Sequence, residues 1–280
     1  MGLLQTAVEA ITLLCPNLEF WTLQSGGKAY GVEFYGQPGI EWIVPLTEKA
    51  PRIPEPYASN IFYYPQVDFL NSITTSTSWK FCEIRPDIIV GHTPHPNGMG
   101  LAQAVGIFLA MYKSVHGEGA EIVFPGNELT WKATHCDTSQ DVLAKFHIFA
   151  SLRPEDVSGK AFNVADEARV NWEGIWPALC QYFGLKGVGP RPGEEGSLRG
   201  VAWVMAQQGN WKNWVEENDL QDGFIEKASW EMMGLVFGYL IFDKEYDLSA
   251  LRELGFKEST STVGGYITAF ERMRMAKIIP

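Results

Sequence analysis

Short apolar strand patterns alternate with helical patterns over the first 165 residues of this 280-residue chain, and helical patterns predominate after them. Residues 18–23 and 79–84 have the composition of buried strands, whereas residues 101–115 carry apolar side chains at helical spacing. Strands that alternate with helices are typical of a parallel sheet with helices packed on it. The sequence therefore predicts an α/β fold, with an α/β part at residues 1–165 and a mainly helical part at residues 166–280.

Composition and charge narrow the classes of partner. Hydrophobic residues make up 46 % of the chain and the formal net charge is −11. A nucleic-acid surface or an anionic membrane surface needs clustered Lys and Arg, which this charge disfavours. The longest apolar run, residues 232–242, is shorter than the about 20 residues that a bilayer crossing requires. With no signal-peptide pattern at the start, we expect a cytoplasmic protein that acts on a small molecule, without nucleic-acid or membrane partners.

Three polar residues near predicted strand and helix ends are candidates for chemistry. Ser25 and Lys28 follow the first predicted strand, and Tyr63 stands just ahead of a predicted helix. Groups at the carboxyl ends of parallel strands converge on one crevice, so these residues are expected to meet. A lysine cation lowers the pKa of a nearby tyrosine, which then donates a proton or hydrogen bond to a carbonyl oxygen. From residue types alone, a solvated lysine and packing tyrosines are the alternative.

A series of short motifs occurs in a fixed order along the chain. They are Gln24-Ser25-Gly26-Gly27-Lys28-Ala29-Tyr30, Phe62-Tyr63-Tyr64, and the segments at 51–54, 85–94, 124–126 and 161–164. This order resembles the enone reductases of the progesterone 5β-reductase and iridoid synthase type, an atypical branch of the short-chain dehydrogenases. By this resemblance Lys28 matches the active-site lysine and Tyr63 the catalytic tyrosine, with Tyr64 as the second choice and Ser25 beside them.

The resemblance also implies binding residues and shows two departures. Ala29 stands where the family pattern has a His, and Val67 replaces one residue of an acidic pair. Family position places four residues beside the nicotinamide of the cofactor, namely Arg85, Pro86, Ile88 and Ile89. It places three residues in the substrate pocket, namely Tyr30, His92 and Met99. His92-x-x-His95 has no third ligand at a recognisable spacing, so we expect no metal site.

One family feature is missing from these 280 residues. The glycine-rich turn that follows the first strand of the family, and that holds the cofactor pyrophosphate, is absent. We therefore expect a partial, N-terminally truncated Rossmann-like parallel sheet with a mostly helical C-terminal substrate lobe. The resemblance implies NADP(H), which would then lack its usual phosphate site. Loss of the first strands exposes a sheet edge, and such an edge allows a homodimer in which each copy covers the other.

Three functions are compatible with these patterns. The first is an NADPH-dependent reductase of secondary metabolism, in which Tyr63 and Lys28 polarise an enone or carbonyl substrate. The second is a cofactor-independent isomerase or cyclase that uses the same Tyr–Lys pocket. The third is a non-catalytic truncated paralogue. We rank the reductase slightly ahead, because family membership is the stronger argument.

Overall fold

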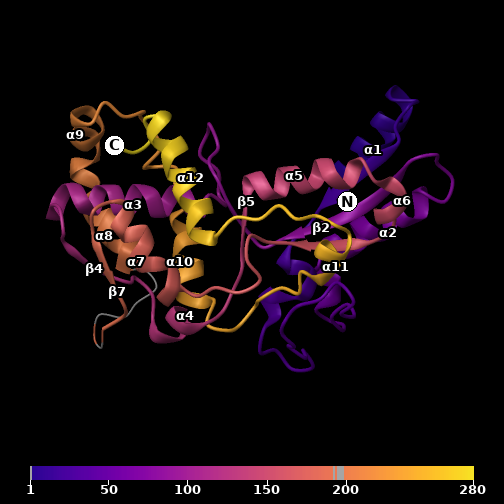
Figure 1. Cartoon of the computed structure of the whole chain (residues 1–280), viewed down its shortest axis with the longest axis horizontal. Coiled ribbons are helices and arrows are strands. Elements are labelled where there is room, and N and C mark those ends of the chain that lie inside the picture. The colour runs from indigo at the N-terminus through magenta and orange to yellow at the C-terminus, as the bar shows by residue number, and fades with distance from the viewer. Residues whose placement is uncertain (1, 192, 194–198) are drawn as a thin grey trace. The chain divides into compact units, whose positions relative to one another are not determined.

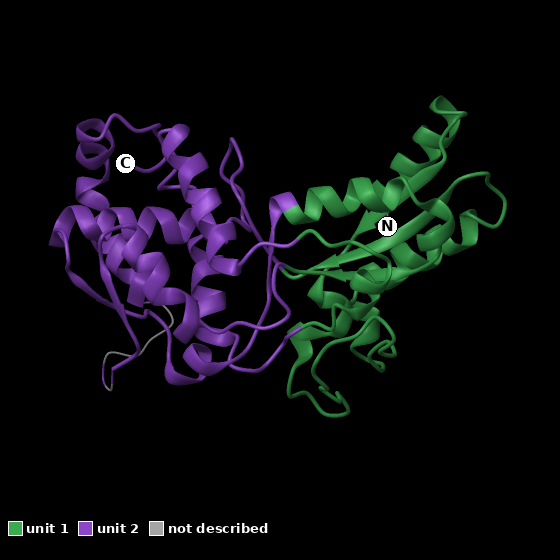
Figure 2. Cartoon of the chain, viewed as in Figure 1, with its two compact units in different colours: residues 1–87, 142–165, 246–258 green, residues 88–141, 166–245, 259–280 purple. Residues whose placement is uncertain are grey.

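The computed structural model describes residues 2–191, 193 and 199–280. The chain forms two compact units, which Figure 2 colours separately. Unit 1 comprises residues 1–87, 142–165 and 246–258, and unit 2 comprises residues 88–141, 166–245 and 259–280. Each unit is thus assembled from three stretches of chain. The expected division into parts at residues 1–165 and 166–280 stays a prediction.

Unit 1 is built on a three-stranded parallel sheet. Its strands are β1 (Phe20–Gln24), β2 (Lys80–Pro86) and β6 (Ala161–Val164), in the order β1-β2-β6. Strand β2 is central, and its register aligns Glu83 with Leu23 on one side and Ala161 on the other. A parallel sheet with helical connections confirms the predicted α/β class.

Helices of unit 1 connect and flank these strands (Figure 1). They are α1 (Gly2–Leu14), α2 (Tyr63–Ile73), α5 (Gln140–Ser151), α6 (Pro154–Val157) and α11 (Ser249–Glu253), with short 3-10 helices at Gly27–Tyr30 (η1), Val32–Phe34 (η2) and Ala58–Asn60 (η3). All of α5 except its first two residues belongs to unit 1. An apolar cluster joins Val8 of α1, Leu70 of α2 and Phe81 of β2. The helices are therefore fixed to the sheet by burial of apolar side chains.

Unit 2 contains two pairs of short parallel strands. Strand β3 (Ile88–Val90) pairs with β5 (Asp137–Ser139), and β4 (Glu121–Val123) pairs with β7 (Lys186–Val188). Its helices are α3 (Leu101–His116), α4 (Glu128–Lys132), α7 (Trp172–Tyr182), α8 (Arg199–Ala206), α9 (Trp211–Glu217), α10 (Trp230–Tyr239) and α12 (Thr262–Met275), with a 3-10 helix at Gln208–Asn210 (η4). Every residue of α3 from Leu101 to Met111 is buried, so this helix is the central element of the unit.

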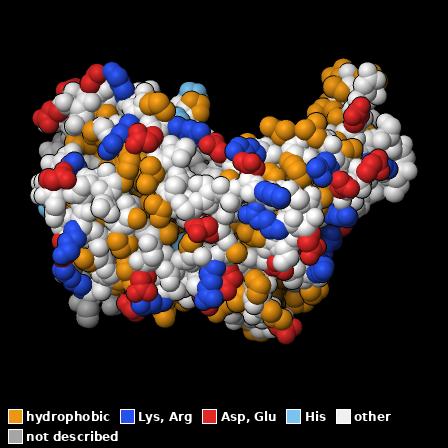
Figure 3. Space-filling view, in the orientation of Figure 1, with side chains coloured by type: hydrophobic (Ala, Val, Ile, Leu, Met, Phe, Trp, Pro, Cys, Tyr) orange, Lys and Arg blue, Asp and Glu red, His pale blue; other side chains and the backbone are white. Residues whose placement is uncertain are grey.

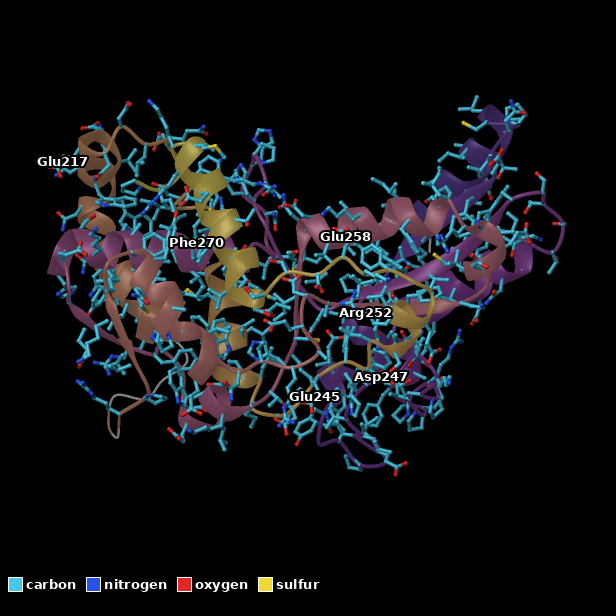
Figure 4. The ribbon with its side chains drawn as sticks, in the orientation of Figure 1. Glu217, Glu245, Asp247, Arg252, Glu258 and Phe270 are labelled. Atoms are coloured by element: carbon cyan, nitrogen blue, oxygen red, sulfur yellow. The ribbon has the colours of Figure 1, made fainter. Side chains whose placement is uncertain are left out.

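Aromatic side chains form the core of unit 2. Phe124, which follows β4, lies with its ring centroid 5.1 Å from Trp131 and 5.0 Å from Phe237. Gly106 of α3 lets α12 approach closely, because a Cβ there would lie 3.0 Å from the ring of Phe270, labelled in Figure 4. Large aromatic side chains each bury a large apolar area, so they contribute strongly to this core beside its aliphatic residues.

The visible surface mixes charges of both signs. Figure 3 shows acidic and basic side chains interspersed over the face in view, in keeping with the net charge of −11. Among the described helices, none combines the length and the hydropathy that a membrane crossing demands.

Replacing Phe124 by Ala tests how far unit 2 depends on its aromatic core. Phe124 is fully buried, so F124A should lower the free energy of unfolding by about 3–5 kcal/mol. Denaturant unfolding followed by tryptophan fluorescence measures this loss. Ile148→Ala, at a side chain that is 63 % exposed, is the control and should cost well under half as much. Equal losses in the two variants would contradict the assigned core.

Candidate active site

The turn that follows β1 is tied to β2 by a buried carboxylate. The Ser25 N–H donates to the Ile84 carbonyl at 2.8 Å, and Ser25 Oγ donates to Glu83 Oε1 at 2.6 Å. Glu83 and Arg85 lie two residues apart in β2 and so share one face of the sheet. Arg85 Nη2 donates to Glu83 Oε2 at 2.7 Å. Sequence reasoning missed Glu83, although an acidic residue within an otherwise apolar strand is a signal that it has a partner.

Tyr63 presents its hydroxyl beside this turn. A Cβ built on Gly26 would lie 3.7 Å from Tyr63 Oη and 3.2 Å from the Pro86 carbonyl oxygen. The Tyr63 hydroxyl makes no hydrogen bond to any other residue that the structure describes. Burial raises the pKa of Tyr63, and the carboxylates of Glu33 and Glu83 raise it further. Tyr63 is therefore a protonated hydrogen-bond donor next to a position that carries no side chain.

Tyr64 has a different environment although it is the next residue. Its hydroxyl donates to the Ala29 carbonyl at 2.9 Å and accepts from the Ile53 N–H at 3.1 Å. The guanidinium of Arg52 lies over its ring, 4.6 Å from the centroid. Both hydrogen-bonding capacities of this hydroxyl are thus used within unit 1. Of the two tyrosines, Tyr63 is the one whose hydroxyl remains available to a ligand.

Lys28 lies on η1, with its ammonium 2.5 Å from Glu33 Oε1. No hydrogen bond or ion pair joins Lys28 to Tyr63 in the described part of the chain. The expectation that a lysine cation lowers the pKa of Tyr63 was wrong in direction, because burial and two carboxylates raise that pKa. The lysine charge is instead engaged by Glu33, five residues along the chain.

Tyr30, expected in the substrate pocket, lies in the core of unit 1. Its hydroxyl donates to Asn163 Oδ1 at 2.6 Å, and Asn163 Nδ2 donates to the carbonyls of Leu46 and Asp247 at 2.9 and 3.2 Å. Asp247 is labelled in Figure 4. Burial raises the pKa of Tyr30 to about 12, although the nearby Arg85 acts in the opposite direction. This buried network holds the end of β6 against the loop that contains Leu46.

The four residues assigned to the cofactor by family position belong to different units. Arg85 is committed to Glu83, and the Pro86 carbonyl faces Gly26, both in unit 1. Ile88 and Ile89 are residues of β3 in unit 2. The turn after β1 leads into η1, a 3-10 helix of four residues, and not into the long helix whose N-terminus accommodates a pyrophosphate. This turn therefore lacks the helix N-terminus on which the phosphates of a dinucleotide usually lie.

The remaining two pocket candidates lie in the loop of unit 2 that follows β3. The His92 N–H donates to Gln140 Oε1 at 2.6 Å, and burial together with the charge of Arg272 lowers the pKa of the His92 imidazole. Met99 is 64 % exposed and precedes α3. Both effects favour the neutral form of His92. Within the described ranges, His, Cys, Asp and Glu side chains form no group of three or more that could hold a metal ion.

Known proteins are similar in sequence to this chain over nearly its whole length. A family profile described as PRISE-like Rossmann-fold domain matches residues 1–280. The short chain dehydrogenase ausT of Aspergillus calidoustus is 35 % identical over 280 residues, which cover 98 % of this chain and 67 % of that protein. The short chain dehydrogenase sirQ of Leptosphaeria maculans is 33 % identical, over 99 % of this chain and 70 % of the relative. The 3-oxo-Delta(4,5)-steroid 5-beta-reductase of Arabidopsis thaliana is 27 % identical, over 100 % of this chain and 69 % of that reductase.

Solved structures share the fold at low sequence identity. The NADPH complex of RMD from Pseudomonas aeruginosa aligns with a TM-score of 0.57 at 11 % identity, over 95 % of this chain and 69 % of that one. The GDP-mannoheptose C4 reductase MlghC from Campylobacter jejuni, with NADP bound, aligns with a TM-score of 0.60 at 12 % identity, over 97 % and 72 %. At such identities the likeness establishes the architecture alone.

Conservative substitutions separate the roles of the two tyrosines. Tyr64→Phe leaves a buried carbonyl and a partly buried N–H without their shared hydroxyl, so it should destabilise the protein by about 1–3 kcal/mol. Tyr63→Phe removes a hydroxyl that has no protein partner and should leave stability nearly unchanged. Thermal unfolding of both variants gives the comparison. A Y63F loss as large as that of Y64F would show that Tyr63 has a structural role instead.

Proposed function

Because the chain belongs to the PRISE-like Rossmann-fold family, we propose that it is a reductase-type enzyme of small-molecule secondary metabolism that acts on an enone or carbonyl compound. The observation that carries the proposal is the Tyr63 hydroxyl. It is half-buried, protonated, without a hydrogen-bond partner among the described residues, and next to Gly26, which carries no side chain. The names of the fungal and plant relatives, which include short chain dehydrogenases and a steroid 5-beta-reductase, support the same class.

In the proposed reaction Tyr63 acts on the substrate oxygen. Its hydroxyl donates a hydrogen bond to the carbonyl oxygen, and this bond strengthens as negative charge develops there in the transition state. A raised pKa suits this role, because Tyr63 stays protonated through the neutral and mildly alkaline range. The family implies NADP(H) as the hydride source, and the step assigned to this chain concerns the carbonyl oxygen only.

Lys28 remains a proposed member of the site. Its ion pair with Glu33 joins two side chains that are each about two-fifths exposed, at 42 % and 43 %. Exposed pairs of this kind contribute little net stability, so the ammonium exchanges partners at small cost. We propose that bound substrate draws Lys28 toward the developing negative charge, where a cation assists Tyr63.

A cofactor-independent isomerase or cyclase is the second candidate. The short 3-10 helix after the Ser25-Gly26-Gly27 turn favours it, because this turn lacks the long helix whose N-terminus binds a pyrophosphate. A neutral tyrosine hydroxyl stabilises an enolate as well without hydride transfer as with it. A non-catalytic paralogue remains the third reading, and turnover measurements distinguish it from both enzymes.

We further propose a homodimer through the edge of unit 1. Strand β1 is the last strand in the order β1-β2-β6, so one side of its backbone has no neighbouring strand in the described residues. Two β1 edges related by a two-fold axis would pair antiparallel. Sedimentation at several protein concentrations tests this assembly, and a monomer at all of them would contradict it.

Calorimetric titration of NADPH, with NADH as the comparison, is the first test of the reductase proposal. Micromolar binding of NADPH, followed by turnover of enone substrates that Tyr63→Phe abolishes, would support the reductase. Failure of a folded chain to bind either nucleotide would discard hydride transfer for this chain. Isomerisation without cofactor that Y63F abolishes would then establish the second candidate, and no turnover of any substrate would leave the non-catalytic paralogue.

Adding one methyl group at Gly26 tests whether the space beside Tyr63 holds the reacting carbonyl. Gly26 has extended backbone angles that any residue adopts, and a Cβ there would lie 3.7 Å from Tyr63 Oη and 3.2 Å from the Pro86 carbonyl oxygen. The second contact is tight, so Gly26→Ala should fold with a small shift of the turn, which thermal unfolding measures, and should lower kcat/KM by about tenfold or more. Gly209→Ala is the matched control, since a Cβ there meets nothing within 4 Å. Unchanged kcat/KM in G26A would place the substrate elsewhere.

A further inference from the structure

Glu83 joins two parts of unit 1 through one buried carboxylate. The residue is 4 % exposed and lies between the buried Cys82 and Ile84 in β2. Each carboxylate oxygen has one partner, Ser25 Oγ at 2.6 Å and Arg85 Nη2 at 2.7 Å. Burying a carboxylate costs free energy unless the carboxylate is ion-paired and hydrogen-bonded. Both contacts are therefore needed to keep Glu83 buried and charged.

The Ser25 side of this arrangement leads directly to the Tyr63 hydroxyl. Ser25 is the first residue after β1, and the next residue, Gly26, is the one whose Cβ position faces Tyr63 Oη at 3.7 Å. The turn then closes with the Ala29 N–H donating to the Gly26 carbonyl at 2.9 Å. The hydrogen bond from Ser25 to Glu83 therefore holds the residue that immediately precedes Gly26, the position that Tyr63 faces.

Charge provides a second connection between Glu83 and Tyr63. Two carboxylates act on the tyrosine, Glu33 from η2 and Glu83 from β2, and both raise its pKa in addition to burial. Each carboxylate has its own cation, Lys28 for Glu33 and Arg85 for Glu83. Removing either negative charge makes the phenolate less unfavourable, so the pKa of Tyr63 should fall in both cases.

We infer that Glu83 is a positioning residue of the Tyr63 site: its carboxylate holds the Ser25–Gly26 turn in the place where that turn faces the Tyr63 hydroxyl. Its negative charge in addition disfavours the phenolate form of Tyr63. The inference rests on the proposed function, because a fixed turn matters for turnover only if Tyr63 contacts substrate. The effect of the Ser25–Glu83 hydrogen bond on the turn is measurable without any substrate.

Three variants separate position from charge. Glu83→Gln weakens the Ser25–Glu83 hydrogen bond and removes a negative charge. Ser25→Ala removes this hydrogen bond and keeps the charge. Glu33→Gln removes a negative charge that takes no part in the hydrogen bond. Position is measured by hydrogen exchange at the Ala29 amide, which reports closure of the turn. Charge is measured by the NMR titration of Tyr63 in protein labelled with ¹³C at the tyrosine Cζ, with Y63F assigning the signal.

The expected pattern differs among the variants. E83Q should speed exchange at Ala29 by about tenfold, as expected for weakening of one charge-assisted hydrogen bond, and should lower the pKa of Tyr63. S25A should speed exchange without lowering that pKa. E33Q should lower the pKa and leave exchange unchanged. With an assay in hand, the alkaline limit of activity in E83Q should move to lower pH by the same amount as the NMR pKa.

Two results would overturn the inference. One is a folded E83Q protein in which Ala29 exchange or the Tyr63 titration is that of the original chain. The other is S25A with unchanged exchange, which decides the question even if E83Q does not fold. Turnover that survives Y63F refutes the proposed function and leaves these physical readouts unaffected, so the two failures are distinguishable.

Discussion

The buried carboxylate of Glu83 is the interaction on which the geometry of unit 1 depends. It lies in the central strand β2, and its two oxygens bind Ser25, just beyond β1, and Arg85, two residues further along β2. Across the sheet, Asn163 in β6 is aligned with Arg85, and its Oδ1 accepts a hydrogen bond from the Tyr30 hydroxyl. Polar side chains of β2, of β6 and of the turn after β1 thus satisfy one another within unit 1. Such a network is stable only when its members are satisfied together, which fixes the adjacent turn.

The contrast between Tyr63 and Tyr64 follows from where α2 begins. Consecutive residues of a helix point about 100° apart, so two adjacent tyrosines at its first turn face different surroundings. Tyr64 turns inward to bridge the Ala29 carbonyl and the Ile53 N–H. Tyr63 faces Gly26, where no side chain competes for the space. One hydroxyl is thereby used for structure, and the other has no hydrogen-bond partner among the described residues.

Unit 2 is organised differently, because many aromatic rings are buried around one helix, α3. Helix α3 is enclosed along most of its length, and Gly106 allows α12 to lie close against it. Phe124 connects rings contributed by α4 and α10. The family profile matches residues 1–280, and the relatives named as short chain dehydrogenase and 5-beta-reductase align with nearly the whole of this chain, so their sequence similarity includes unit 2.

The sequence by itself determined the class of fold, the family and the identity of several elements. The strand expected at residues 18–23 is observed as Phe20–Gln24, and the helix expected at 101–115 is observed as Leu101–His116. These features are encoded in local periodicity, which one sequence displays directly. Only the tertiary structure decided which of two adjacent tyrosines is free, that Lys28 pairs with Glu33, and that the pKa of Tyr63 is raised. Those outcomes depend on burial and on partners such as Ser25 and Glu83, which lie 58 residues apart, and no local pattern specifies such a pairing.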